Sequence, residues 1–97
     1  MVYYSKKDYD LLGFMKSERT NKKYKAVIQN KKTDQIKYIH FGQLPYEHYR
    51  DLTGLNLYPK FSHNDDYRKE LYINRHKKFL KKNHYSPEYF STYYLWS

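Results

Sequence analysis

The residues best suited to chemistry recur at helical spacing in the second half of the chain. They are Asp65, Arg68, Tyr72, Arg75, His76 and Phe79. Steps of three and four residues place side chains on one face of a helix. An ordinary amphipathic helix fills such a stripe with aliphatic residues. This stripe is charged and aromatic, so we expect it to meet an organised partner: acidic and aromatic groups of the same fold, another protein, or phosphate.

Two interpretations of this stripe follow from its arginines. In the architectural one, which we favour, Asp65 caps the helix, while Arg68 or Arg75 pairs with Glu47 or Asp51. A buried guanidinium needs such a partner, because stranding it costs about 3–5 kcal/mol. In the other interpretation the arginines contact phosphate. The complete structural motif that we predict is His63, Asp65, Arg68, Tyr72, Arg75, His76 and Trp96.

Lysines dominate the positive charge of the chain. The formal net charge is +9, and the arginines are few. A lysine field attracts phosphate or acidic protein surface without the fork geometry that reads bases. Cations interleaved with aromatic rings are the two components of a sequence-tolerant nucleic-acid binder. The alternative for the lysines alone, which we prefer, is a solvated helix face. The candidate residues for nucleic-acid or acidic-partner binding are Arg68, Lys69, Arg75, Lys77, Lys78, Lys81 and Lys82.

Enzymatic chemistry finds little support in the residue types. The chain has no cysteine, and Gly13, Gly42 and Gly54 form no phosphate-cradling loop. His63 and His76 would lie ~20 Å apart on one helix, too far to share a metal ion. We therefore predict no catalytic residue, no metal site and no cofactor, and keep a metal-dependent nuclease as a distant third hypothesis.

The elements that must position these residues suggest a small α+β domain. We expect an N-terminal arm over residues 1–20, an extended segment or single turn interrupted by Gly13, and one domain over residues 21–97. Alternating apolar residues on either side of a polar turn predict a β-hairpin. The predicted elements of the domain are the hairpin strands 24–29 and 36–41, a short helix over 45–52, a long basic helix from 62–65 to about 82, and an aromatic C-terminal helix from 86.

Each predicted helix has its own start or stop signals. Pro45 suits a first helical turn, and Gly54 suits a left-handed end. In the long helix, acids at the start and lysines at the end complement the helix dipole. Ser86 before Pro87 predicts the cap of the last helix. No apolar run is long enough to span a membrane, so we expect no membrane span.

Three blocks of residues occur in order along the chain: Tyr24…Phe41-Gly42…Tyr46…Tyr49, His63-x-Asp65-x-x-Arg68-x-x-x-Tyr72-x-x-Arg75-His76 and Ser86…Ser91…Leu95-Trp96. This pattern resembles an uncharacterised family of small, basic, tyrosine-rich proteins of large double-stranded DNA viruses and tailed phages. The resemblance covers roughly residues 20–97. Lys69 departs from it, since relatives often have arginine there, and so does the segment 87–89.

The resemblance implies a non-enzymatic structural protein of a virion, such as a minor capsid or cement component. It would reside in the virion and inside the infected host cell. Fourteen tyrosines supply surfaces that would bind other virion proteins. The alternative function is a basic protein that binds DNA or RNA of the viral genome. Either function would be independent of a cofactor.

Overall fold

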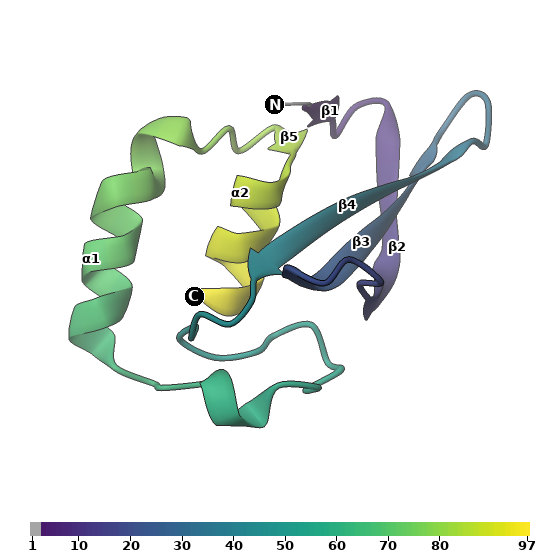
Figure 1. Cartoon of the computed structure of the whole chain (residues 1–97). Coiled ribbons are helices and arrows are strands. Elements are labelled where there is room, and N and C mark those ends of the chain that lie inside the picture. Colours follow the sequence, from purple (N-terminus) through teal and green to yellow (C-terminus); the bar gives the residue numbers. More distant parts are fainter. Residues whose placement is uncertain (1–2) are drawn as a thin grey trace.

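A three-stranded antiparallel sheet forms the larger part of the fold. The computed structural model describes residues 3–97, and the N-terminal end of the predicted arm, residues 1–2, lies outside them. The strands are β2 (Tyr9–Lys16), β3 (Lys22–Asn30) and β4 (Ile36–Gln43), in the order β2-β3-β4 (Figure 1). The predicted α+β class and the predicted hairpin, formed by β3 and β4, are confirmed.

One face of this sheet carries the core. Tyr24 pairs with Phe41 and Ala26 with Ile39 across β3 and β4, and all four side chains are buried. Lys25 and Tyr38 occupy the opposite face, with Lys25 half-buried and Tyr38 exposed. The alternation read in the sequence therefore matches the pleat, because successive side chains of a strand point to opposite faces.

Strand β2 takes up residues for which we expected only an extended segment or a turn. It pairs along the length of β3, and the register shifts between Leu11 and Gly13. The extra residue, Leu12, is 55% exposed. A bulge of this kind breaks the two-residue alternation in the sequence, which explains why the strand could not be recognised. Residues 9–16 of the predicted arm thus belong to the same sheet as the hairpin.

A second, two-stranded sheet joins the N-terminal segment to the residues just before the C-terminal helix. Strand β1 (Tyr4–Ser5) is antiparallel to β5 (His84–Tyr85), with Tyr4 opposite Tyr85. The Lys6 N–H also donates to the Asn83 carbonyl at 2.9 Å. In Figure 1 this short sheet lies at the end of the molecule to which α1 leads.

Helix α1 (Asp66–His76) begins as predicted but is shorter than expected. The Asp65 carboxylate caps it by accepting from the N–H groups of Tyr67 and Arg68. It is followed by a single 3-10 turn, η2 (Lys77–Phe79), so the prediction of a helix to about residue 82 is wrong. Continuing the helix would stack lysines of like charge four residues apart, which destabilises it. The chain instead turns back to form β5.

The predicted short helix over residues 45–52 is also wrong. This segment is irregular, and its backbone N–H groups bond to distant parts of the chain. Tyr49 and Arg50 both donate to the Leu95 carbonyl, at 2.9 and 3.0 Å, and Leu52 donates to Tyr94 at 2.8 Å. Tertiary hydrogen bonds therefore replace the bonds of the predicted helix. A 3-10 turn, η1 (Pro59–Phe61), follows before α1.

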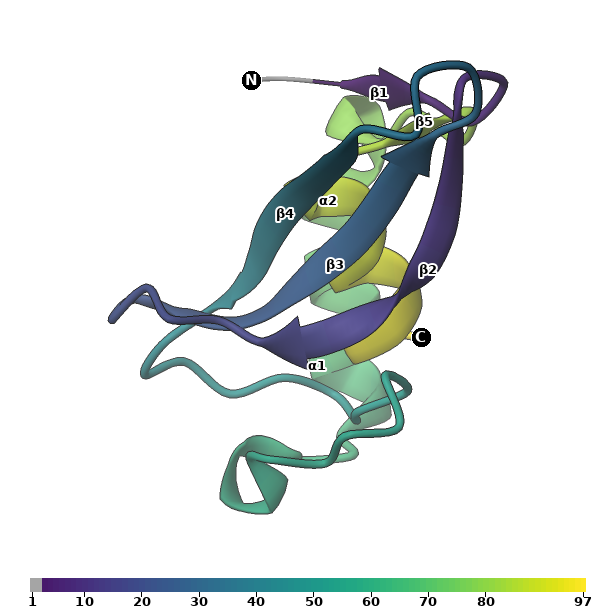
Figure 2. The same ribbon diagram turned by 90° about the vertical axis from the view of Figure 1, so that its right-hand side faces the viewer.

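The C-terminal helix forms the middle layer of the fold. As predicted, Ser86 caps it, accepting from the Tyr89 N–H, and α2 (Pro87–Phe90) continues into a π-helical turn, η3 (Ser91–Leu95). Figures 1 and 2 show this helix between the sheet and α1. Phe90 and Leu95 are buried in the core. None of the helices formed by residues 3–97 has the length and apolar character that crossing a membrane requires.

Candidate functional site

The aromatic residues of the predicted motif form one stack. Tyr72 of α1 lies between Trp96, with ring centroids 4.2 Å apart, and His76, at 4.1 Å. His63 contacts the Trp96 ring at a centroid distance of 5.2 Å. Burial raises the pKa of the Tyr72 phenol, so the hydroxyl is protonated at neutral pH. The stack fastens α1 to the C-terminal end of the chain.

The two arginines of the motif are both on the surface. Arg68 pairs with Glu47 at 2.9 Å, and the side chains are 44% and 45% exposed. The hydrogen bond from Arg68 lowers the pKa of Glu47. Arg75 makes no ion pair within residues 3–97. The architectural interpretation thus holds for Asp65, which caps the helix, and for Arg68, which pairs with Glu47. Arg75 has no partner of opposite charge among the described residues.

A buried polar network behind the motif could not be recognised in the sequence. Lys23 and His48 are each 1% exposed. The Lys23 ammonium donates to the Tyr46 carbonyl at 2.6 Å and to His48 Nδ1 at 2.9 Å, and His48 Nε2 donates to Ser62 Oγ at 3.0 Å. Burial lowers the pKa of Lys23 to about 8 and that of His48 to about 4. Nothing in the local sequence distinguishes Lys23 from the other lysines of the chain.

A second pair, buried Tyr24 and half-buried Asp51, holds the irregular segment to the sheet. The Tyr24 hydroxyl donates to Asp51 and accepts from the Leu57 N–H at 3.0 Å. Burial first, and then the bond to Asp51, raise the pKa of Tyr24. Tyr24 thus has the hydrogen-bond partner that a buried phenol needs. That partner is Asp51, which we had expected to pair with an arginine.

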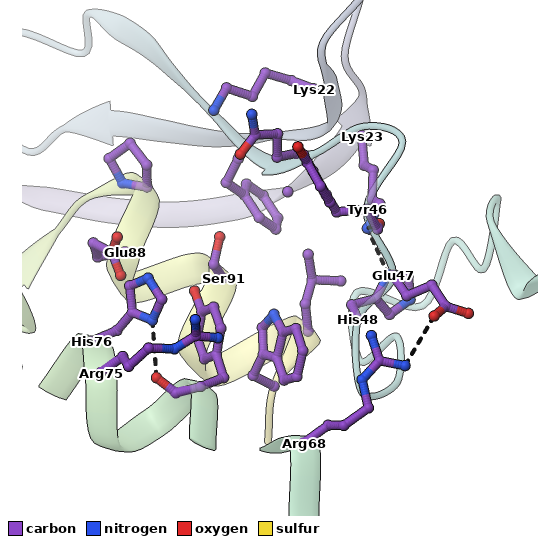
Figure 3. Close-up of a pocket in the computed structure, with 17 residues that line it drawn as sticks. Lys22, Lys23, Tyr46, Glu47, His48, Arg68, Arg75, His76, Glu88 and Ser91 are labelled. Carbon is purple, nitrogen blue, oxygen red and sulfur yellow. Dashed lines mark hydrogen bonds and ion pairs between the residues drawn. The ribbon is translucent and has the colours of Figure 1, made fainter. Parts of the chain in front are cut away.

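A pocket of about 490 Å³ opens between α1, the C-terminal helix and the end of the β3–β4 hairpin. We call it the arginine pocket (Figure 3). Its volume is within the usual range for small-ligand sites. The stack of Tyr72, His76 and Trp96 forms part of its wall. The polar side chains that line it include Lys22, Arg68, Arg75, His76, Glu88 and Ser91.

A different set of cations gathers where β1 meets β5. Ser5, Lys6, Lys7 and Lys31 line a shallow hollow there together with Asn83 and His84. The Lys81 ammonium lies 5.4 Å from the centre of the Tyr3 ring in the same region. We use the term lysine surface for the cationic side chains of this end of the molecule, Lys6, Lys7, Lys31, Lys77, Lys78, Lys81 and Lys82.

The structure therefore divides the predicted binding residues between separate places. Arg68 and Arg75 line the arginine pocket. Lys77, Lys78, Lys81 and Lys82 follow α1 and are all exposed. Lys69 belongs to neither group, since its ammonium lies 4.8 Å from the centre of the Tyr49 ring. Lys6, Lys7, Lys22 and Lys31 were not predicted, because they are far from the motif in sequence.

Comparison with protein-family models, curated protein sequences and solved structures found no match to this chain. The resemblance to small proteins of DNA viruses therefore stays a prediction. What the chain does has to be inferred from its own charges and contacts.

Proposed function

We propose that this chain is a non-enzymatic protein that binds nucleic acid through the lysine surface, with little preference for sequence. The observation that carries the proposal is the pairing of β1 with β5, which brings the N-terminal lysines beside those that follow α1. The seven lysines belong to segments that meet at this end of the molecule: the turns after β1 and β3, and the stretch from α1 to β5 (Figure 1). Among the described residues, one ion pair links a lysine of this surface to an acid: Lys31 and Asp10 are 3.7 Å apart.

The lysine surface also offers aromatic rings. Phe79 is 50% exposed, and the Lys78 ammonium lies 5.1 Å from its ring centre. Tyr3 is half-buried beside Lys81 and His84. Unpaired bases stack on such rings while neighbouring cations neutralise phosphates. Because lysine is a point charge with no fork geometry, the contact favours phosphate over any particular base.

A protein-binding role through tyrosines is less well supported by the geometry. None of residues 84–97 is exposed, so the terminal aromatic residues pack within the chain itself. The tyrosines that remain exposed, Tyr38, Tyr46 and Tyr67, belong to three different segments. The predicted function as a virion structural protein, with its location in the virion and its protein partners, stays a prediction.

The experiment that tests the proposal is a salt series of binding to single-stranded DNA. The parent is compared with the triple variant Lys77→Gln, Lys81→Gln, Lys82→Gln. Each lost phosphate contact lowers the slope of log K against log salt by about 0.7, so three contacts lower it by about 2. Circular dichroism checks that the variant is folded.

A matched control removes three exposed cations elsewhere, with Lys16→Gln, Arg19→Gln, Lys60→Gln. Both variants lose the same net charge, so a general attraction between basic protein and DNA would affect them equally. We expect the control to keep a slope close to that of the parent. Equal slopes for the two variants, or no salt-sensitive binding by the parent, would contradict the proposal.

A further inference from the structure

We propose that the arginine pocket is a separate binding site for a phosphate monoester whose organic part can donate a hydrogen bond. The pocket is lined by the open end of the hairpin, α1, the C-terminal helix and residues 46–48 of the irregular segment. It does not include the lysines that follow α1. This site therefore does not depend on the nucleic-acid binding proposed for the lysine surface.

The charges of the pocket favour an anion. Four cationic side chains line it, against the carboxylates Glu47 and Glu88. Glu47 is already paired with Arg68, and the Lys23 ammonium is held by a carbonyl and by His48. A cleft with an excess of one charge concentrates the opposite charge from solution. The pocket therefore attracts anions even though it contains two acids.

Two of the cations lack a carboxylate partner. Within residues 3–97, neither Lys22 nor Arg75 has a carboxylate oxygen within 4.0 Å. Figure 3 shows Lys22 on the sheet side of the pocket and Arg75 on the α1 side, with Ser91 between them. Two unpaired positive charges match a dianion better than a single carboxylate. An arginine fork and a serine hydroxyl are suitable donors to phosphate oxygens.

The acid on the wall of the pocket indicates the second part of the ligand. Glu88 Oε2 is buried and has no hydrogen-bond partner among the described residues. It lies beside His76 in Figure 3. A buried carboxylate oxygen without a donor is costly, and a hydroxyl or amino group of the ligand would satisfy it. Inorganic phosphate lacks that organic group, whereas a nucleotide or a sugar phosphate has it.

The experiment uses Trp96, the one tryptophan of the chain, which lines the pocket. Its fluorescence is followed while the whole protein is titrated with adenosine monophosphate, adenosine or inorganic phosphate at ~0.15 M ionic strength. Calorimetry with the same probes covers binding that leaves the fluorescence unchanged. We expect saturable binding that is tightest for the monophosphate, weaker for phosphate and absent for adenosine.

Variants then assign the contacts. Arg75→Gln is expected to weaken binding of the monophosphate by about tenfold or more, since a charge-assisted hydrogen bond is lost. Arg19→Gln removes the same charge from an exposed turn and should change nothing. Glu88→Gln should reduce the preference for the monophosphate over inorganic phosphate. Arg75 is exposed and makes no ion pair with any residue from 3 to 97, so its loss leaves the fold intact.

The phosphate could come from a free nucleotide or from the end of a strand. Oligonucleotides with a 5′-phosphate or a 5′-hydroxyl separate these sources: tighter binding of the phosphorylated strand, lost in Arg75→Gln, assigns the strand end. Binding of the free monophosphate alone assigns the nucleotide. The proposal is overturned by equal binding of adenosine and its monophosphate, by equal effects of Arg75→Gln and Arg19→Gln, or by no saturable binding.

Discussion

The arginine pocket and the lysine surface are both basic, but they are built in opposite ways. Several side chains of the pocket wall are held in place by hydrogen bonds and ring contacts, including a lysine and a histidine that are almost fully buried. The lysine surface consists of ammonium groups on turns and irregular segments, all on exposed residues except that of Lys6, which is half-buried. Cations of the first kind can select a ligand by shape, whereas those of the second kind supply attraction.

This difference teaches that net charge alone does not identify a binding site. The same +9 chain contains lysines held by the fold, such as Lys23, and lysines free to follow a phosphate backbone, such as Lys82. Changes to the buried and stacked residues of the pocket should therefore alter stability, whereas changes to its exposed cations should alter ligand selection. Changes on the lysine surface should alter salt-dependent binding and leave stability almost unchanged.

The largest difference is expected between two aromatic residues, one in each region. Trp96→Ala removes the ring stacked on Tyr72 and should lower the free energy of unfolding by about 3–4 kcal/mol. Phe79→Ala removes a ring that is 50% exposed on the lysine surface and should cost below about 1 kcal/mol. Urea unfolding followed by circular dichroism measures both. Similar losses would show that the two regions are equally integrated into the fold.

The next effect concerns the glycine in the pocket wall. Gly42 has a φ of +76°, and a Cβ there would lie 2.9 Å from Leu95 Cδ1 and 3.2 Å from Lys23 Cβ. Gly42→Ala should cost about 2–3 kcal/mol, since overpacking adds to the backbone strain. Gly54→Ala has a similar φ of +87° but open space around it, so strain alone costs about 1 kcal/mol. Thermal or urea unfolding measures the loss of stability in both variants, and the difference between the two losses is the steric cost at Gly42. Equal losses would contradict a steric cost there.

Acidification should destabilise the pocket side of the molecule through His48. Its pKa is about 4 in the folded chain, below the ordinary value of 6.5. Between these pH values the unfolded chain binds more protons than the folded chain. The free energy of unfolding therefore decreases as the pH falls. Between pH 7 and pH 5 the loss from this histidine is about 2 kcal/mol.

His48→Gln tests this contribution, because glutamine is polar and does not titrate. Burial also lowers the pKa values of His40 and His63, which add to the loss in the same direction. Unfolding measured at both pH values should show a smaller pH dependence in the variant than in the parent. An unchanged pH dependence would assign the acid sensitivity to the other histidines.

The smallest effect is expected for the surface pair at the mouth of the pocket. Arg68→Gln breaks the ion pair with Glu47, which is nearly half exposed on both sides. Such pairs contribute below about 1 kcal/mol to stability. A double-mutant cycle with Glu47→Gln measures the coupling free energy between the two residues. A coupling of several kcal/mol would restore the view that Arg68 locks the fold.

Much of the local structure could be predicted from the sequence because its signals act over a few residues. Asp65 and Ser86 cap the helices they were expected to cap. The alternation around the polar turn predicted the hairpin. For the site, the motif spacing brought out Arg68, Tyr72, Arg75 and His76, all of which line one pocket.

The remaining features could not be predicted, since they depend on contacts between distant segments. The proline-led segment over 45–52 had helix signals, but its N–H groups bond to residues 94 and 95. The lysines after α1 lie outside that helix, in a segment that leads to β5 and to its pairing with β1. The bulge at Leu12 concealed a strand.

The sequence by itself therefore determined the caps, the hairpin and the excess of positive charge. Only the tertiary structure decided which cations are buried and which are free. Lys22 faces the pocket, Lys23 is inside the fold and Lys25 pairs with Glu18 on the other side of the sheet, although all three are neighbours on β3. The physical reason is that charge belongs to a residue type, whereas burial and partners depend on what the folded chain brings together.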